Sequence, residues 1–322
     1  MKIFTQTSAL LLFINGCSVT QIGPTHVNDV GVFVRKDLPI YQTKTKSIVG
    51  WGFLLESIKG VDVILLGEQH DHATGHAVEL AIVEDVMNKY PGSTLALEML
   101  ERDEQPVVDD FMENFIDSDT LEKITLSTNW GGSGGWVAWY QPIIDATKKC
   151  GGGVVAANAP RRYVRIARKD GFGRIDELPK NRRVYVDYPE RLSDGRYRQR
   201  FWELAASMHG GDSEEPFEDL KEIDVSTIDP KDPVLPVFRS QQVWDATMAQ
   251  SIVNARPSIS KKVVLLVGQF HVEYEGGVVQ ELKKRMPNVR IAVISIQREM
   301  PDEAWWGNDK HPPIADFMIV GE

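Results

Sequence analysis

Cysteine is scarce in this chain of 322 residues, which contains only Cys17 and Cys150. One disulfide could at most join the extreme N-terminus to the middle of the chain, so a fold held together by disulfides is excluded. The first apolar run, Ala9 to Ile14, is also too short for a transmembrane helix. The hydrophobic content of 42% is that of a globular protein with a true core.

Basic residues are in deficit, with 36 Lys and Arg against 46 Asp and Glu and a net charge of −10. A nucleic acid is therefore excluded as the expected partner, because phosphate contacts need a basic face. The local exception is an arginine-rich stretch, which comprises Arg161, Arg162, Arg165, Arg168, Arg174, Arg182, Arg183, Arg191, Arg196, Arg198 and Arg200. Such a stretch usually forms a solvated, salt-bridged surface, and less often it receives anionic groups such as phosphate or propionate.

The N-terminus has the order of a bacterial lipoprotein signal: Lys2, an apolar run, and a small residue before Cys17. We predict that residues 1–16 are a signal peptide, that Cys17 is lipidated, and that residues 17–30 tether the protein to the membrane. The expected location is the cell envelope, at the outer membrane facing the periplasm or the exterior. The alternatives are an uncleaved or simple secretory peptide and a cytosolic start; palmitate labelling that Cys17→Ser abolishes would confirm the anchor.

Short apolar segments alternate with helical periodicity along most of the chain, and this alternation predicts a mostly parallel α/β sheet with helices on both faces. The expected strands are Val61–Gly67, Ser93–Met99, Gly153–Asn158, Lys262–Gly268, Val289–Ile296 and Phe317–Val320, with a short edge strand at Gly31–Val34. The expected helices are Ala73–Lys89, Asp103–Phe115, Val137–Lys149, Phe238–Asn254 and Val278–Arg285.

The alternation of strand and helix patterns is lost between residues 171 and 236, where charged residues and prolines are frequent. We predict an α/β domain made of residues 31–170 and 237–322, with residues 171–236 as a small helical insertion. Helices are expected within the insertion at Arg196–Met208 and Pro216–Ile223.

Polar side chains follow four of the predicted strands at the point where each strand ends. Ligands of open α/β sheets bind outside the carboxyl ends of the strands, so these side chains are expected to form one pocket. The pocket residues are Glu68, His70, Glu98, Asn158, Arg161 and His271. The alternative for each residue alone is a helix cap or a solvated loop position.

Two kinds of chemistry suit these residue types. Histidine nitrogens with carboxylate oxygens could bind a divalent metal, for which the expected ligands are His70, His76, Glu98 and His271, although their spacing matches no zinc signature. Alternatively, a carboxylate could orient a histidine that serves as general base.

Six blocks occur in the order found in the ChaN family of iron-regulated, haem-binding bacterial lipoproteins, which the chain therefore resembles. The blocks are Gly67-Glu-Gln-His-Asp71 with His76, Ala96-Leu-Glu-Met99, Trp130 with Trp139-Tyr-Gln-Pro142, Ala156-Ala-Asn-Ala-Pro-Arg161, Gln241 to Ala249, and Val263 to Gly277. The resemblance implies an α/β sheet with a small helical domain, and a dimer that encloses two stacked haems.

The resemblance also implies that a tyrosine of one subunit holds each iron, while histidine and lysine of the other hold the propionates. The tyrosine candidates in this sequence are Tyr140, Tyr163 and Tyr274. The sequence departs from the family at Glu273, where arginine is common, and this exchange argues against anion binding at that spot.

We therefore expect an envelope lipoprotein that binds haem for haem or iron acquisition, with an envelope haem-uptake receptor as its partner. Erythromycin esterases and the Tiki/TraB proteases are similar in placing Gly-Glu, strand-end Glu and Gly-x-x-His segments, so a metal-dependent or histidine-based hydrolase is the second prediction. A noncatalytic scaffold is the third.

Overall fold

The computed structural model describes residues 27–125, 127, 130, 132, 134–209, 229–258, 260–301, 305–308 and 311–322. Cys17, the predicted signal and most of the predicted tether lie outside these residues, as does the helix expected at Pro216–Ile223. Within the described part, no helix is both long and apolar enough to cross a membrane.

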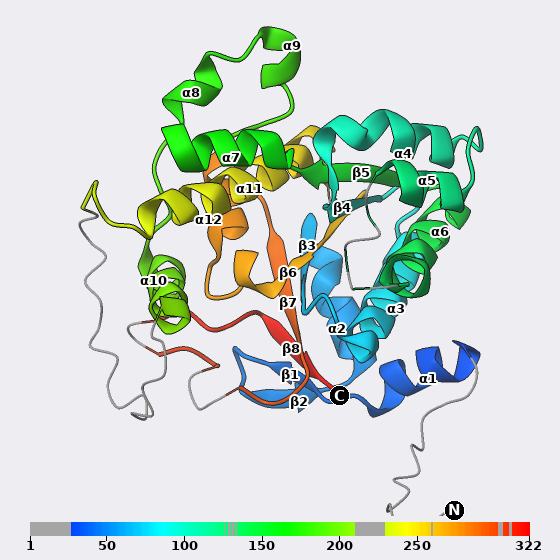
Figure 1. The fold of residues 1–322 in the computed structure, drawn as a ribbon. Helices are drawn as coiled ribbons and strands as arrows, with labels where there is room; N and C mark the ends of the chain where they lie inside the picture. Colours follow the sequence, from blue (N-terminus) through cyan, green and yellow to red (C-terminus); the bar gives the residue numbers. More distant parts are fainter. Residues whose placement is uncertain are drawn as a thin grey trace, which may run out of the picture.

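One sheet of eight strands runs through the molecule in the order β2-β1-β8-β7-β3-β6-β4-β5 (Figure 1). Strands β3 to β8 run parallel to one another, whereas β1 is antiparallel to both of its neighbours, β2 and β8. The strands are β1 (Ile40–Gln42), β2 (Ser47–Val49), β3 (Val63–Glu68), β4 (Thr94–Glu101), β5 (Gly153–Asn158), β6 (Val263–Gly268), β7 (Ile291–Gln297) and β8 (Phe317–Val320). The predicted mostly parallel α/β fold is confirmed.

Strand β3 lies at the centre, and every one of its residues is buried. Burial on both faces explains why its sequence is an unbroken apolar run rather than an alternating one. A side chain at Gly67 would meet the Cα atom of Gln269 at 3.1 Å, so glycine lets the segment after β6 pack directly against the end of β3.

Helices cover both faces of the sheet (Figure 1). Residues of α2, α3, α4 and α6 share one hydrophobic core with the strands, and α11 and α12 form a second core on the opposite face. These helices are α2 (Trp51–Ser57), α3 (Ala73–Lys89), α4 (Gln105–Met112), α6 (Gln141–Lys149), α11 (Leu235–Asn254) and α12 (Gly277–Arg285). Helix α5 (Ser118–Ile124) and a π-helical turn η4 (Trp136–Tyr140) add to the first core, and α7 (Arg161–Asp170) packs on α11.

The remaining elements are short or peripheral. They are α8 (Gly173–Asp176), α9 (Lys180–Arg183), α10 (Gly195–His209) and the 3₁₀ turns η1 (Ile58–Gly60), η2 (Arg102–Glu104) and η5 (Gln269–His271). Helices α8 to α10 lie in the predicted insertion, where the helix expected at Arg196–Met208 is present; the division into domains itself stays a prediction.

The prediction of an edge strand at Gly31–Val34 is wrong, because this segment lies within helix α1 (Val27–Asp37). Four apolar-rich residues do not distinguish the two periodicities, and tertiary contacts decide between them. Val34 is buried in the core, and the Arg35 guanidinium donates to Asp85 on α3, at 3.1 Å from Nε. The helix is therefore held by its packing on α3.

Candidate functional site

The carboxyl ends of β3, β4, β5 and β6 bring the predicted strand-end residues together. In the register of the sheet Glu68 lies beside Gly268, and the backbone N–H of Gly268 donates to Glu98 Oε2 at 2.6 Å. Asn158 Nδ2 donates to the backbone oxygen of Glu98 at 2.9 Å. The predicted convergence is confirmed, and what the residues do there stays a prediction.

His271 lies between two buried carboxylates at the centre of this site. Its Nδ1 is 2.6 Å from Oδ1 of Asp245, and its Nε2 is 3.5 Å from Oε1 of Glu98. Burial alone would lower the pKa of His271, but the charges of Glu98 and Asp245 outweigh burial and raise this pKa to about 10. Burial would raise the pKa of Glu98, yet the charge of His271 and its hydrogen bond lower it to about 2.

Asp245 was not predicted as a site residue from the sequence. It lies on α11, 26 residues before His271 in the chain. The same helix supplies Gln241, whose Nε2 lies 3.1 Å from His271 Nδ1. The Tyr197 hydroxyl donates to Asp245 Oδ2 at 2.6 Å. The sequence signal was an aspartate between buried-type apolar residues of one helix, in the block Gln241 to Ala249, where a buried carboxylate needs a partner.

His70 is held beside the same cluster by Glu68. Its Nδ1 donates to Glu68 Oε1 at 2.5 Å, and the Tyr140 hydroxyl donates to the same oxygen at 2.7 Å. Burial lowers the pKa of His70, but the hydrogen bond to Glu68 and the charge of Glu98 raise it overall. A Cβ atom at Gly268 would come within 3.2 Å of His70 Nε2, so glycine leaves room for the imidazole.

These electrostatics bear on the predicted hydrolase. A general base must be unprotonated near neutral pH, whereas His271 is protonated there because its pKa is about 10. His271 can therefore donate a hydrogen bond or a proton at the strand ends, but it is poorly suited to accept one. The hydrolase stays a prediction without a favouring observation.

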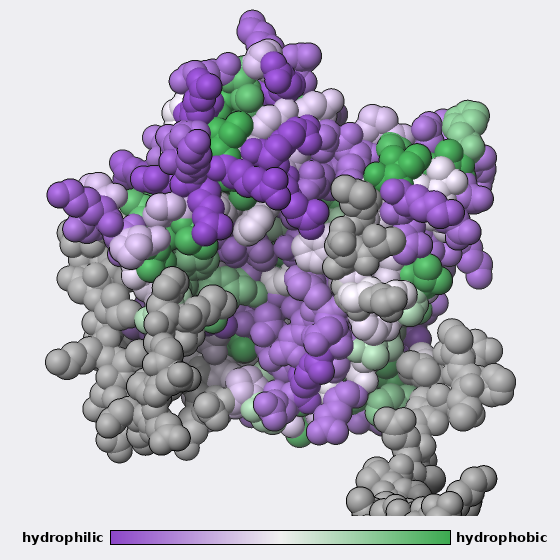
Figure 2. Space-filling view, in the orientation of Figure 1, coloured by the Kyte–Doolittle hydropathy of each residue, from purple (hydrophilic) through white to green (hydrophobic). Residues whose placement is uncertain are grey.

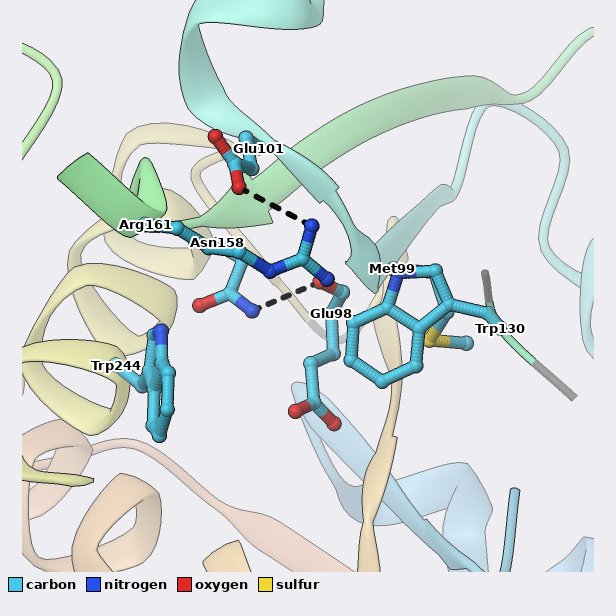
Figure 3. Close-up of a pocket in the computed structure, with 7 residues that line it drawn as sticks. All are labelled: Glu98, Met99, Glu101, Trp130, Asn158, Arg161 and Trp244. Atoms are coloured by element: carbon cyan, nitrogen blue, oxygen red, sulfur yellow. Dashed lines mark hydrogen bonds and ion pairs between the residues drawn. The ribbon is translucent and has the colours of Figure 1, made fainter. Parts of the chain in front are cut away.

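A small cavity of about 210 Å³ opens over the strand ends (Figure 3). Its lining comprises Glu98, Met99, Glu101, Trp130, Asn158, Arg161 and Trp244. The indoles of Trp130 and Trp244 stand on opposite sides, and the Arg161 guanidinium reaches across toward Trp130 while pairing with Glu101 at 3.7 Å. Arg161 therefore lines this cavity together with Glu98 and Asn158, and its role there stays a prediction.

A larger cavity of about 900 Å³ adjoins the small one and shares Arg161 and Trp244 with it. It lies between α7, α10 and α11, where Figure 2 shows apolar surface. Its lining is Arg161, Val164, Arg165, Arg168, Phe201, Trp202, Ala205, Ala206, Pro233, Val234, Val237, Ser240, Gln241 and Trp244. Apolar walls with few polar groups are typical of cofactor sites, whose volumes run from about 300 to 1,000 Å³.

Three arginines line this cavity from one face of α7. Arg161, Arg165 and Arg168 follow the spacing i, i+4, i+7, which places them in one row. Arg165 and Arg168 are exposed, and neither has a carboxylate within 4.0 Å among the residues described. Arg165 and Arg168 are therefore free to receive an anion inside the larger cavity, whereas Arg161 already faces Glu101.

None of the predicted tyrosine ligands lines the larger cavity. Tyr140 is fully buried and bonded to Glu68, and Tyr163 is buried in the core beneath α7. Tyr274 lies under the Arg200 guanidinium, 4.4 Å from the ring centre. A tyrosine ligand to the haem iron stays a prediction, and the positions of these three tyrosines do not support it directly.

Glu273, the departure from the family pattern, is fully paired inside the protein. Arg200 lies 3.1 Å from its Oε2, and Ser295 and Gln297 donate to its Oε1 at 2.6 and 2.7 Å. Three donors inside the protein therefore hold this buried carboxylate.

The predicted metal ligands do not gather as one set. Among the described residues, only Glu68, His76 and Glu79 place three ligand atoms within 4.8 Å of one another. Of these, only His76 was among the predicted metal ligands, and His70, Glu98 and His271 do not form such a group.

The family model described as "Haem-binding uptake, Tiki superfamily, ChaN" matches residues 54–282, well over half of the chain, and so includes every strand-end residue of the site. The chain belongs to the ChaN family. A solved structure titled as cofacial haem binding to ChaN of Campylobacter jejuni has a TM-score of 0.61 and 19% identity, covering 89% of this chain and 98% of that one. The likeness at this identity shows the shared fold.

Two further solved structures are less similar to this chain. An erythromycin esterase, EreC, in its open conformation has a TM-score of 0.42 and 12% identity, covering 80% of this chain and 76% of that one. A succinoglycan biosynthesis protein has a TM-score of 0.43 and 12% identity, covering 85% of this chain and 76% of that one. No curated protein sequence matches the chain.

Proposed function

We propose that this chain binds haem in the 900 Å³ cavity between α7, α10 and α11, as a lipid-anchored envelope protein of haem or iron uptake. The observation that carries the proposal is the combination of apolar walls with a row of arginines, of which Arg165 and Arg168 have no carboxylate partner among the described residues. A porphyrin has two apolar faces and two carboxylates on one edge, and the cavity has a complementary distribution of surface.

The walls fit the porphyrin faces. The cavity is lined by Phe201 and Trp202 from α10, Val164 from α7, and Val237 and Trp244 from α11. Aromatic side chains bury large areas and stack on flat rings, which favours a planar ligand over a compact one. Arg161, Arg165 and Arg168 would receive the propionates, since guanidinium groups bind carboxylates in a bidentate manner.

The iron needs a further ligand. The described lining contains no tyrosine, histidine, cysteine or methionine, the side chains that commonly hold haem iron. The proposal therefore includes a second copy of the chain as the source of the axial ligand, in keeping with the predicted homodimer. The uptake receptor and lipidation at Cys17 stay predictions alongside it.

Titration of the purified chain with hemin tests the proposal. Trp202 and Trp244 line the cavity, so binding should quench tryptophan fluorescence saturably and give a Soret band that differs from that of free hemin. Hemin dimethyl ester is the matched control, because it keeps the ring and the iron and blocks both carboxylates; it should bind at least tenfold more weakly. Quenching that never saturates, or equal binding of the ester, would contradict the proposed site.

A further inference from the structure

Three ionisable side chains face one another behind the strand-end site. Glu68 lies at the end of β3, and His76 and Glu79 lie one turn apart on α3. All three are buried, with exposed fractions of 2%, 2% and 0%. None of them lines either cavity.

The distances suit one shared ion. His76 Nδ1 is 2.8 Å from Glu79 Oε2 and 3.7 Å from Glu68 Oε2. Ligand atoms bound to one metal at about 2.1 Å lie roughly 3.0–3.4 Å apart, so small shifts would bring the three groups around one ion.

Two oxygens of the cluster have no donor. Glu68 Oε2 and Glu79 Oε1 are buried and unpartnered among the described residues. The other Glu68 oxygen already accepts from Tyr140 and from His70. Since a buried carboxylate is costly unless it is paired or coordinates a metal, the two free oxygens point to a missing positive group.

His76 is oriented as metal-binding histidines are. Its Nε2 donates to the backbone oxygen of His70 at 3.2 Å, which leaves the Nδ1 lone pair directed at the carboxylates. Trp139 stacks on the imidazole at 4.7 Å, and Tyr140 contacts it edge-on at 4.9 Å. Metal-binding histidines usually donate their other ring N–H to a carbonyl or carboxylate in this way, which fixes the tautomer of the ring.

We propose that Glu68, His76 and Glu79 bind one divalent transition-metal ion of the zinc or manganese type. One imidazole nitrogen with two carboxylate oxygens suits these ions, and two carboxylates balance their charge. The ion joins the end of β3 to α3. It also fixes Glu68, the residue that holds His70 in the site.

The alternative to a metal ion is a proton shared among these three side chains. Burial, the charge of Glu68 and a hydrogen bond to Glu68 raise the pKa of Glu79 well above its ordinary value, so a neutral Glu79 could donate to Glu68 or to Nδ1 of His76. The substitution Glu79→Gln separates the two occupants, because glutamine has the shape of protonated glutamate but is a poor metal ligand.

The test uses the full chain, free of hemin, stripped with EDTA and then dialysed against Zn²⁺, Mn²⁺ or Co²⁺. Elemental mass spectrometry should find about one ion per wild-type chain, and the melting temperature should rise on loading. Glu79→Gln should bind at least tenfold more weakly and show no rise. The control is Glu281→Gln, a buried glutamate paired with Lys284 and Arg285 on α12, which should keep the ion.

A wild-type chain that binds none of the three ions, and melts identically with and without EDTA, would overturn the proposal. A Glu79→Gln chain that retains the ion would also do so. A variant that is as stable as the wild type under every condition would establish the proton instead. A wild-type chain that binds no ion overturns the proposal even where a variant fails to fold.

Discussion

Replacing Arg165 and Arg168 together with alanine should weaken hemin binding by about 10- to 100-fold. A charge-assisted hydrogen bond contributes roughly 1.5–3 kcal/mol when shielded, and less where solvent screens it as at these exposed side chains. Two such contacts, each discounted to about 0.7–1.4 kcal/mol, give the stated range, since about 1.4 kcal/mol corresponds to a tenfold change in Kd. Fluorescence titration measures the effect.

The matched control removes two positive charges from outside the cavity. Arg174 on α8 and Arg182 on α9 are exposed and do not line it, so the Arg174→Ala/Arg182→Ala chain should bind hemin like the wild type. The dimethyl ester should bind the wild type and the Arg165/Arg168 variant equally. If both double variants weaken hemin binding alike, the effect is one of net charge and the row on α7 is not the propionate site.

Replacing His271 with glutamine should destabilise the protein by about 3–5 kcal/mol near pH 6, the usual cost of leaving buried partner charges uncompensated. The lost partner leaves Asp245 and Glu98 facing each other in the interior. The free energy of unfolding, measured with guanidinium chloride and tryptophan fluorescence, reports the change.

The pH dependence gives this prediction its sign. The pKa of His271 is raised from 6.5 to about 10, so its stabilising contribution is complete below pH 6.5 and is lost as the pH rises through 10. The pKa of Glu98 is lowered from 4.5 to about 2, so its contribution is complete above pH 4.5 and is lost as the pH falls through 2. The difference between wild type and His271→Gln should thus be largest between pH 4.5 and 6.5 and smaller at pH 10.

His311→Gln supplies the control, because His311 lies in a surface turn near the C-terminus. It should change the free energy of unfolding little at either pH. A His271→Gln penalty that is the same at pH 6 and pH 10 would mean that the histidine is neutral in the folded protein, and the account of its two carboxylate partners would be wrong.

The sheet and its polar edge were predictable because both follow from local patterns. Each strand is an apolar run with a polar residue at its exit, and the parallel arrangement brings the exits to one edge. Glu68, Glu98 and His271 could therefore be placed together without a structure. Helix α3 was predicted with its exact bounds, since its apolar spacing is helical and Pro91-Gly92 follows it.

The partners of those residues were not predictable in the same way. Asp245 and Glu79 lie within helices, and their sequences do not reveal which strand end each helix faces. The larger cavity depends on how α7, α10 and α11 pack, and these helices come from separate parts of the chain. The composition indicated that the arginines could bind an anion. Only the fold shows that Arg165 and Arg168 line the same cavity as Trp202 and Trp244.

The position of the iron in crystals of the hemin complex tests the central claim most directly. An anomalous-difference map recorded at the iron edge should show its peak between α7, α10 and α11, with the propionates toward Arg165 and Arg168. A peak over the strand ends beside Glu98, or on a surface away from α7, would contradict the assignment of the cavity to haem.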